Sequence, residues 1–109
     1  MSRDKGMEAE EQACELLRSE GFEIIDRNVH SRFGEIDVIA LKAQTLHFIE
    51  VKSAPDYETA AANITPAKLE RILRTAEVYM QRRGLDLPYV FDAVIVASGM
   101  PHLLENITF

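Results

Sequence analysis

The stretch GEIDVIALKAQTLHFIEVKS, residues 34–53, decides the fold of this chain. Two segments rich in β-branched residues, 34–42 and 46–53, are separated by the short connection AQT. Such a pair predicts a β-hairpin, whose turn we place near Gln44. Residues two apart on a strand point to the same face of a sheet. Glu50 and Lys52 should therefore share one face, while Ile49 and Val51 take the other.

Asp37 lies between two apolar residues of the first strand. With the turn near Gln44, Asp37 is expected beside Glu50. Two carboxylates this close repel each other, and a divalent cation relieves that repulsion. Oxygen ligands of this kind suit Mg²⁺ or Mn²⁺, which bind through one or two carboxylates and keep several waters. Because a lysine beside such a site can stabilise charge on a phosphate, Lys52 completes a pattern typical of metal-dependent phosphodiester hydrolysis.

Each of these residues also has a simpler interpretation. Glu50 and Lys52 could form an ion pair on an exposed sheet face, which would contribute little to stability. Asp37 could instead be paired with Arg32, Arg27 or Lys52. Their occurrence together and in this order favours the metal site.

The N-terminal segment adds a further acid. A helix is expected from a cap at Asp4 to about Glu20, with Gly21 ending it. Glu10 shares the helical stripe of Leu17, which indicates a place at the edge of the buried face. There Glu10 could complete the ligand set or position a water, or it could be a helix N-terminal acid favoured by the helix dipole.

The remaining elements predict an α/β fold in the order α-β-β-β-α-β-β. A strand at 22–28 and a polar turn at 29–34 precede the hairpin, and a loop at 54–63 follows it. Thr65 and Pro66 then mark the start of a helix that ends near Arg83. Strands at 89–97 and 102–109 complete a mixed five-stranded sheet with flanking helices, because the second helix crosses over to a parallel strand. All of residues 1–109 are expected to form one domain.

Composition limits the classes of function. The chain has 109 residues, 47% hydrophobic and 28% charged, and a net charge of −6. It contains no apolar run near the roughly 20 residues of a membrane span, and no signal-like segment. The single Cys14 is expected in the core, in a reducing, cytoplasmic setting.

The acidic net charge argues against a generally basic surface but does not exclude a local basic surface. Lys68 and Arg71 on the second helix are the candidate phosphate contacts of such a surface.

Four polar residues outside this pattern are expected to have no catalytic role. Asp92 lies inside the most apolar strand and is expected to bond a neighbouring strand end or turn. The three histidines, His30, His47 and His102, are scattered along the chain and are predicted to have surface or turn roles.

GEIDVIA followed by FIEVK resembles the PD-(D/E)xK nuclease superfamily. The chain is most similar to the YraN-like family of small bacterial proteins, which are related to archaeal Holliday junction resolvases. The resemblance extends from the N-terminal helix through the RN pair at 27–28, the FDAV at 91–94 and the final ENITF. It implies a restriction-endonuclease-like core and a metal-dependent DNA endonuclease acting on branched or structured DNA.

The resemblance also implies roles for individual residues. Asp37, Glu50 and the Val51 main-chain carbonyl would hold Mg²⁺ or Mn²⁺. Lys52 would be the catalytic lysine, and Glu10 the helix-borne acid of the resolvase branch. Branched DNA receiving two related cuts would suit a two-fold homodimer.

Three positions depart from the family pattern. Ala9 stands where Gly is usual, and Ser53 where Thr is frequent. Ala54 replaces an Arg, which removes a phosphate contact. The missing Arg and the acidic net charge favour an alternative: a catalytically inactive nucleic-acid-binding or protein-interaction module that keeps the nuclease fold.

Overall fold

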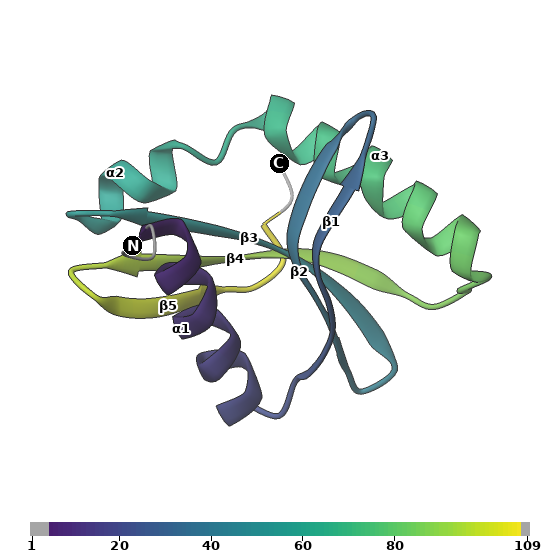
Figure 1. The fold of residues 1–109 in the computed structure, drawn as a ribbon, viewed down its shortest axis with the longest axis horizontal. Helices are drawn as coiled ribbons and strands as arrows, with labels where there is room; N and C mark the ends of the chain where they lie inside the picture. Colours follow the sequence, from purple (N-terminus) through teal and green to yellow (C-terminus); the bar gives the residue numbers. More distant parts are fainter. Residues whose placement is uncertain (1–4, 108–109) are drawn as a thin grey trace.

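The computed structural model describes residues 5–107, which form a mixed five-stranded sheet with helices on both faces (Figure 1). The strands lie side by side in the order β1-β2-β3-β4-β5. All neighbours are antiparallel except β3 and β4, which are parallel. The predicted α/β fold is confirmed, with one short helix added. The elements are α1 (Lys5–Ser19), β1 (Glu23–Ser31), β2 (Gly34–Lys42), β3 (Thr45–Ala54), α2 (Tyr57–Ala62), α3 (Pro66–Arg83), β4 (Tyr89–Ala97) and β5 (Met100–Leu104).

The β2–β3 hairpin forms as expected. Its last pair is Lys42 with Thr45, so the turn consists of Ala43 and Gln44. Both turn residues have positive φ, 50° and 65°. This conformation matches the right-handed twist of the flanking strands, which explains why the hairpin adopts it without glycine. The turn fixes the register that brings the candidate acids together.

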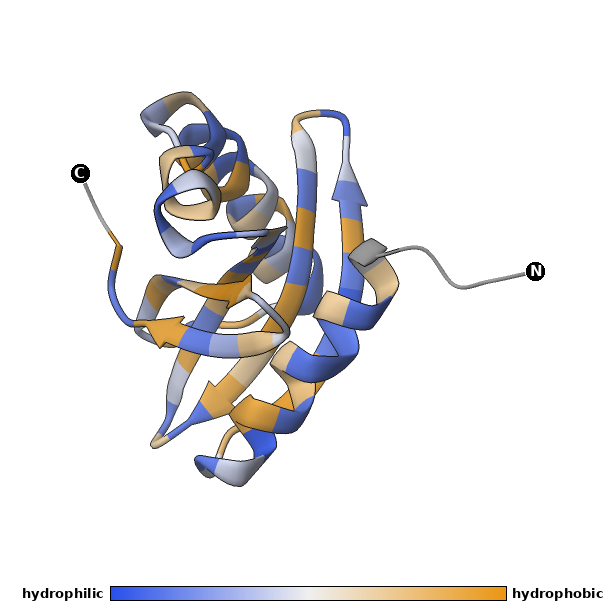
Figure 2. Ribbon diagram, turned by 90° about the vertical axis from the view of Figure 1, so that its left-hand side faces the viewer, coloured by the Kyte–Doolittle hydropathy of each residue, from blue (hydrophilic) through white to orange (hydrophobic). Residues whose placement is uncertain are grey.

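The helices cover the sheet unequally. α1 packs on one face, with Cys14 and Leu17 against Val38, Ile49 and Val94. α2 and α3 cover the opposite face. α3 contributes Ile72, Ala76 and Tyr79 to a cluster with Ile39 and Phe48, and α2 contributes Ala60 to a cluster with Ala93 and Ile95. Figure 2 shows this layering, with hydrophobic residues concentrated in the strands between the helices.

The ends of α3 follow the predicted signals. The Thr65 side chain accepts a hydrogen bond from the Lys68 amide, Pro66 occupies the first turn, and Gly84 ends the helix at φ 63°. α1 ends at Ser19, close to the expected position, and Gly21 follows at φ 90°. The predicted cap Asp4 lies outside the described residues.

The expected loop at 54–63 is wrong. The Asp56 side chain accepts a hydrogen bond from the Thr59 amide and begins the six-residue helix α2. Ala60 of this helix is fully buried. A helix this short has too few turns to show an amphipathic period in the sequence, so the small residues resembled a loop.

The boundaries of β1 and β5 also differ from the prediction. β1 continues to Ser31, which pairs with Gly34, so the expected six-residue polar turn shrinks to Arg32 and Phe33. β5 begins at Met100 and ends at Leu104, whereas a strand was expected over 102–109, of which residues 108–109 lie outside the described part of the chain. Residues 105–107 form no strand, although the Ile107 amide donates to the Phe91 carbonyl at 2.7 Å. Within the described part of the chain, no helix is long and apolar enough to cross a membrane.

Candidate active site

The candidate site lies where β2 separates from β3. The ladder between these strands ends at the pair Val38 and Ile49, while β3 remains paired with β4 as far as Ala54. In this fork, Asp37 Oδ2 accepts a hydrogen bond from the Val51 amide at 2.8 Å. A side-chain carboxylate thus replaces the backbone acceptor that the ladder no longer supplies, and it holds Asp37 against β3.

Asp37, Glu50 and Lys52 line one cavity of about 180 Å³. Lys52 Nζ lies 3.5 Å from Glu50 Oε1, and their side chains are only 27% and 14% exposed. The pair therefore lies in a cavity. The simpler interpretation, an ion pair on an exposed sheet face, does not describe it. The complete lining is Gly34, Glu35, Asp37, Glu50, Lys52, Lys68, Arg71 and Ile72.

The environment raises the pKa of Asp37 to about 8. Burial is the largest cause, followed by the negative charge of Glu50; a side-chain hydrogen bond with Glu50 also raises the pKa. The hydrogen bond from the Val51 amide lowers it but does not compensate. No ion pair joins Asp37 to a cation within residues 5–107, so the alternative pairings with Arg32, Arg27 or Lys52 are not observed. At neutral pH the Asp37 carboxyl group is therefore mostly protonated, beside the carboxyl group of Glu50.

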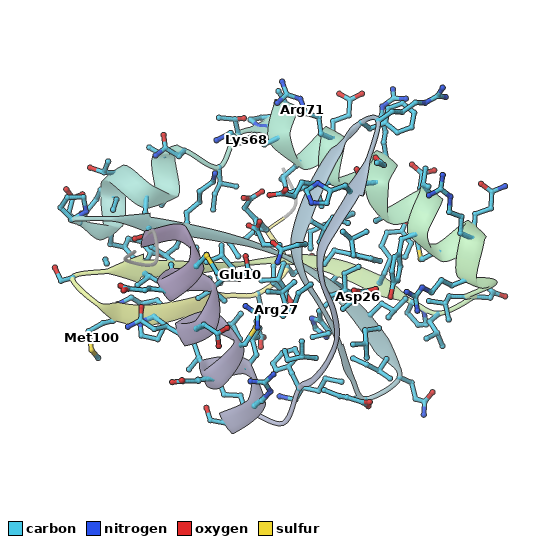
Figure 3. All side chains as sticks on the ribbon, in the orientation of Figure 1. Glu10, Asp26, Arg27, Lys68, Arg71 and Met100 are labelled. Atoms are coloured by element: carbon cyan, nitrogen blue, oxygen red, sulfur yellow. The ribbon has the colours of Figure 1, made fainter. Side chains whose placement is uncertain are left out.

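Cations from α3 complete the cavity. Lys68 and Arg71 lie on the first turns of this helix, as Figure 3 shows. The pKa of Lys68 is lowered, first by burial and then by the positive charge of Lys52. The cavity therefore brings two ammonium groups, which repel each other, next to two carboxyl groups that also repel each other.

Glu10 does not line this cavity. It projects from α1 on the opposite face of the sheet and lies next to Arg27, as Figure 3 shows. Its Oε1 accepts hydrogen bonds from Arg27 Nε at 3.2 Å and Asn28 Nδ2 at 3.0 Å. Glu10 borders a neighbouring cavity of about 310 Å³, which Asp37 and Glu35 also line. The structure therefore places Glu10 on the far side of Asp37 from Glu50 and Lys52.

The donor set for a metal ion is small. Within residues 5–107, no group of three or more His, Cys, Asp or Glu side chains could hold a metal ion. The remaining candidates are the carboxylates of Asp37 and Glu50 and the main-chain carbonyl of Val51. These are hard oxygen donors, and Mg²⁺ commonly binds proteins through one or two carboxylates and completes its shell with water. The residues present therefore fit Mg²⁺ or Mn²⁺.

Comparison with known proteins gives the family. A model described as "Uncharacterised protein family UPF0102" matches residues 9–96.

The chain belongs to the UPF0102 family.

The UPF0102 protein of Sulfurimonas denitrificans is 49% identical over 108 residues, which are 99% of each chain. That of Helicobacter pylori strain HPAG1 is 50% identical over 107 residues, 98% of this chain and 93% of the relative. The UPF0102 protein of Aliarcobacter butzleri is 47% identical over 109 residues, 99% of each chain. These matches confirm the YraN-like part of the sequence resemblance. The names of these relatives give a family and no reaction, so a reaction must be argued from the site.

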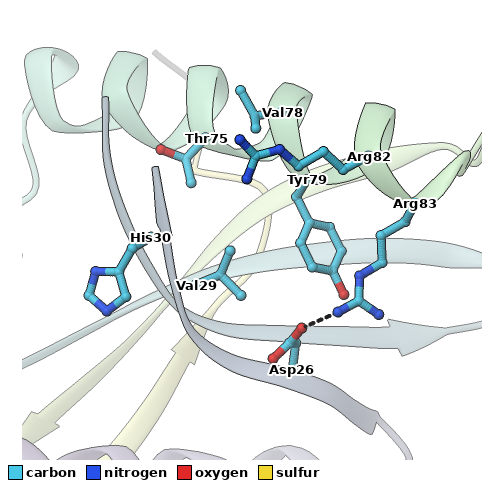
Figure 4. Close-up of a pocket in the computed structure, with 8 residues that line it drawn as sticks. All are labelled: Asp26, Val29, His30, Thr75, Val78, Tyr79, Arg82 and Arg83. Carbon is cyan, nitrogen blue, oxygen red and sulfur yellow. Dashed lines mark hydrogen bonds and ion pairs between the residues drawn. The ribbon is translucent and has the colours of Figure 1, made fainter. Parts of the chain in front are cut away.

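Another cavity of this UPF0102 chain, of about 180 Å³, lies farther along α3 (Figure 4). Its charged groups are already partly paired, because Arg83 Nη2 lies 2.9 Å from Asp26 Oδ2 and the guanidinium stacks 4.8 Å from the Tyr79 ring. None of Asp37, Glu50 and Lys52 lines this cavity. We assign it no role in the candidate chemistry.

One polar network was only half predicted. Asp92 is 1% exposed and accepts a hydrogen bond from the Asn106 amide at 2.8 Å, which confirms the expected structural role. Its second carboxylate oxygen pairs with His47 Nδ1. The predicted surface role of His47 is therefore wrong, and its side chain is only 13% exposed. The apolar strands around both residues signalled burial, but nothing in the sequence indicated which partner each would find.

Proposed function

We propose that this UPF0102 chain is a metal-dependent endonuclease that hydrolyses phosphodiester bonds in DNA. The observation that carries the proposal is the shared cavity of Asp37 and Glu50, where the pKa of Asp37 is raised to about 8 and Lys52 lies 3.5 Å from Glu50. A carboxyl group with a strongly raised pKa beside a partly buried lysine is typical of functional sites.

The carboxyl groups of the cavity suit a cation, and its lysines suit a phosphate. Asp37, Glu50 and the Val51 carbonyl would hold Mg²⁺ or Mn²⁺, relieving the competition between the two carboxyl groups. A phosphate would relieve the repulsion between Lys52 and Lys68, which lowers the pKa of Lys68. When bound, the metal would supply a Lewis acid that makes water more acidic and stabilises negative charge on the phosphate.

The chain's own residues would do the rest. Lys52, oriented by Glu50, would stabilise the negative charge that develops on the phosphate oxygens, or orient the attacking water. Arg71 and Lys68 would hold the DNA backbone at the same cavity. Glu10, held in one orientation by Arg27 and Asn28, would act from the adjoining cavity on the other side of Asp37.

Two observations favour a second candidate, an inactive binding module with the same fold. Ala54 stands where the related pattern has an arginine, and no third carboxylate joins Asp37 and Glu50 in the described residues. The endonuclease proposal includes branched DNA as the substrate and a two-fold homodimer that makes two related cuts, and both candidates include a cytoplasmic location.

The deciding experiment is cleavage of labelled linear, flapped and four-way-junction DNA with Mg²⁺ or Mn²⁺. Asp37→Ala and Lys52→Ala proteins are purified identically to exclude a contaminating nuclease, and the exposed Glu77→Gln on α3 serves as a matched control. Cleavage by the parent and the control, lost in both site variants, supports the endonuclease. DNA binding without cleavage in any lane supports the binding module.

A further inference from the structure

The turn between β1 and β2 holds an aromatic ring among cations beside the candidate cavity. The Phe33 ring centroid lies 4.9 Å from the Arg32 guanidinium carbon and 5.6 Å from that of Arg74. The next residue, Gly34, lines the cavity itself, together with Arg71. We refer to Arg32, Phe33, Arg71 and Arg74 as the Phe33 cluster.

The cluster is fixed in place by the packing of the turn on α3. Ser31 Oγ and Thr75 Oγ1 are hydrogen-bonded at 2.8 Å, with Thr75 only 1% exposed. The Phe33 amide donates to the same Ser31 oxygen at 3.0 Å. A Cβ added at Gly34 would lie 3.2 Å from the Arg71 Cβ, so the turn and the helix are in close contact. The turn that carries Phe33 is therefore held against α3 beside the cavity.

The positive charge of the cluster is mostly unneutralised. Among residues 5–107, neither Arg32 nor Arg71 forms an ion pair with a carboxylate. Arg74 is paired with Glu70 at 3.2 Å, but both side chains are more than half exposed, which makes that pair weak. In a chain of net charge −6, this local concentration of guanidinium groups attracts an anion.

We infer that the Phe33 cluster binds an unpaired nucleotide of the DNA next to the phosphate held in the cavity. The base stacks on the ring by replacing the exposed Arg32, and the arginines contact the adjoining phosphates. A fully paired duplex presents no free base face, and taking a base out of the stack costs energy. The inference rests on the proposed function and narrows its substrate to DNA with a single-stranded segment at the cut, such as a flap.

The first test compares affinities in EDTA, where no metal-dependent cleavage occurs. Labelled single-stranded, flapped and fully paired DNA of one sequence are titrated by fluorescence anisotropy. Phe33→Leu keeps an apolar contact but removes the stacking face, and Tyr89→Leu changes another partly exposed aromatic residue as a control. We expect Phe33→Leu to weaken single-stranded and flapped DNA binding about tenfold or more, without changing duplex binding. Equal affinities of the parent and Phe33→Leu for flapped DNA would overturn the inference.

A second test needs no variant of the protein. The fluorescent base 2-aminopurine is placed at successive positions of the unpaired arm, and stacking on an aromatic ring quenches its emission. Quenching confined to a position beside the junction supports the inference, and absence of quenching at every position overturns it.

Cleavage of the same substrates in Mg²⁺ separates this inference from the proposed function. Flap binding that depends on Phe33, with no cleavage, supports the nucleotide site and rejects the nuclease. Cleavage of duplex and flap at equal rates, unaffected by Phe33→Leu, supports the nuclease and rejects the nucleotide site.

Discussion

At the scale of single residues, the raised pKa of Asp37 makes stability depend on pH. An aspartate in an unfolded chain has a pKa near 3.9, whereas that of Asp37 in the folded protein is about 8. Between these values the folded state binds more protons than the unfolded state, so this residue's stabilising contribution is complete below about pH 4 and is lost as the pH rises to about 8.

Asp37→Asn should remove this dependence. The amide oxygen can still accept the hydrogen bond from Val51, but it cannot ionise. In metal-free buffer we expect the variant to become more stable than the parent as the pH rises from 5 to 9. Urea unfolding at several pH values measures the difference, with Glu77→Gln as the control. Free energies of parent and variant that stay parallel over this range would contradict the assigned pKa.

Metal binding should restore the folding stability that the parent protein loses as Asp37 ionises. Because Asp37 must lose its proton to become a ligand, Mn²⁺ affinity should rise about tenfold per pH unit below pH 8. At a metal concentration 100 times the dissociation constant, the folded state should gain about 2.7 kcal/mol. Calorimetry in buffers of different ionisation enthalpy counts the protons released. We expect Glu50→Gln to weaken binding strongly, and unchanged binding by this variant would rule out the assigned ligands.

At the scale of elements, the sequence could predict contacts within the hairpin but not contacts between elements. The spacing of Asp37 and Glu50 about the turn was enough to bring them together, because a hairpin register follows from the turn length. The helical stripe of Glu10 correctly indicated partial burial. It could not show that α1 covers the face opposite Lys52, since that depends on how the chain crosses the sheet.

The Arg27 pairing of Glu10 can be tested separately from catalysis. Arg27→Met leaves the Glu10 carboxylate, which is 12% exposed, with Asn28 as its remaining hydrogen-bond partner among residues 5–107. We expect a loss of about 1–3 kcal/mol in unfolding free energy. Adding Glu10→Gln should recover part of it, because the buried charge is gone. Additive effects in this double-mutant cycle would show that the two residues are not coupled.

Glu10→Gln alone addresses the catalytic assignment. The amide can still bind Asn28, so we expect little change in stability and a cleavage rate lowered about tenfold or more. Cleavage at the parent rate would make Glu10 a structural partner of Arg27, bordering the site without acting in it.

At the scale of the whole molecule, the fold separates charges that the composition averages. A net charge of −6 argues against DNA binding only if the charge is evenly spread. Instead, Lys52, Lys68 and Arg71 line one cavity, and Arg32 and Arg74 flank it through Phe33. The sequence showed that α3 carries basic residues. It did not show that α3 approaches β2 closely at Gly34, which brings these residues to the same cavity as the carboxylates.

The salt dependence of DNA binding reports how many of these cations contact phosphates. Each contact adds about 0.7–0.9 to the slope of log affinity against log salt concentration, because it releases counterions. The few cations at this cavity therefore predict a shallow slope, and Lys68→Gln and Arg71→Gln should each reduce it by about one contact. Arg82→Gln, on the same helix but outside the cavity, is the matched control and should leave the slope unchanged. If all three variants lowered the slope equally, DNA would follow the length of α3 and the cavity would have no special part in binding. If only Arg82→Gln lowered it, the backbone would lie at the other end of the helix, away from Asp37 and Glu50.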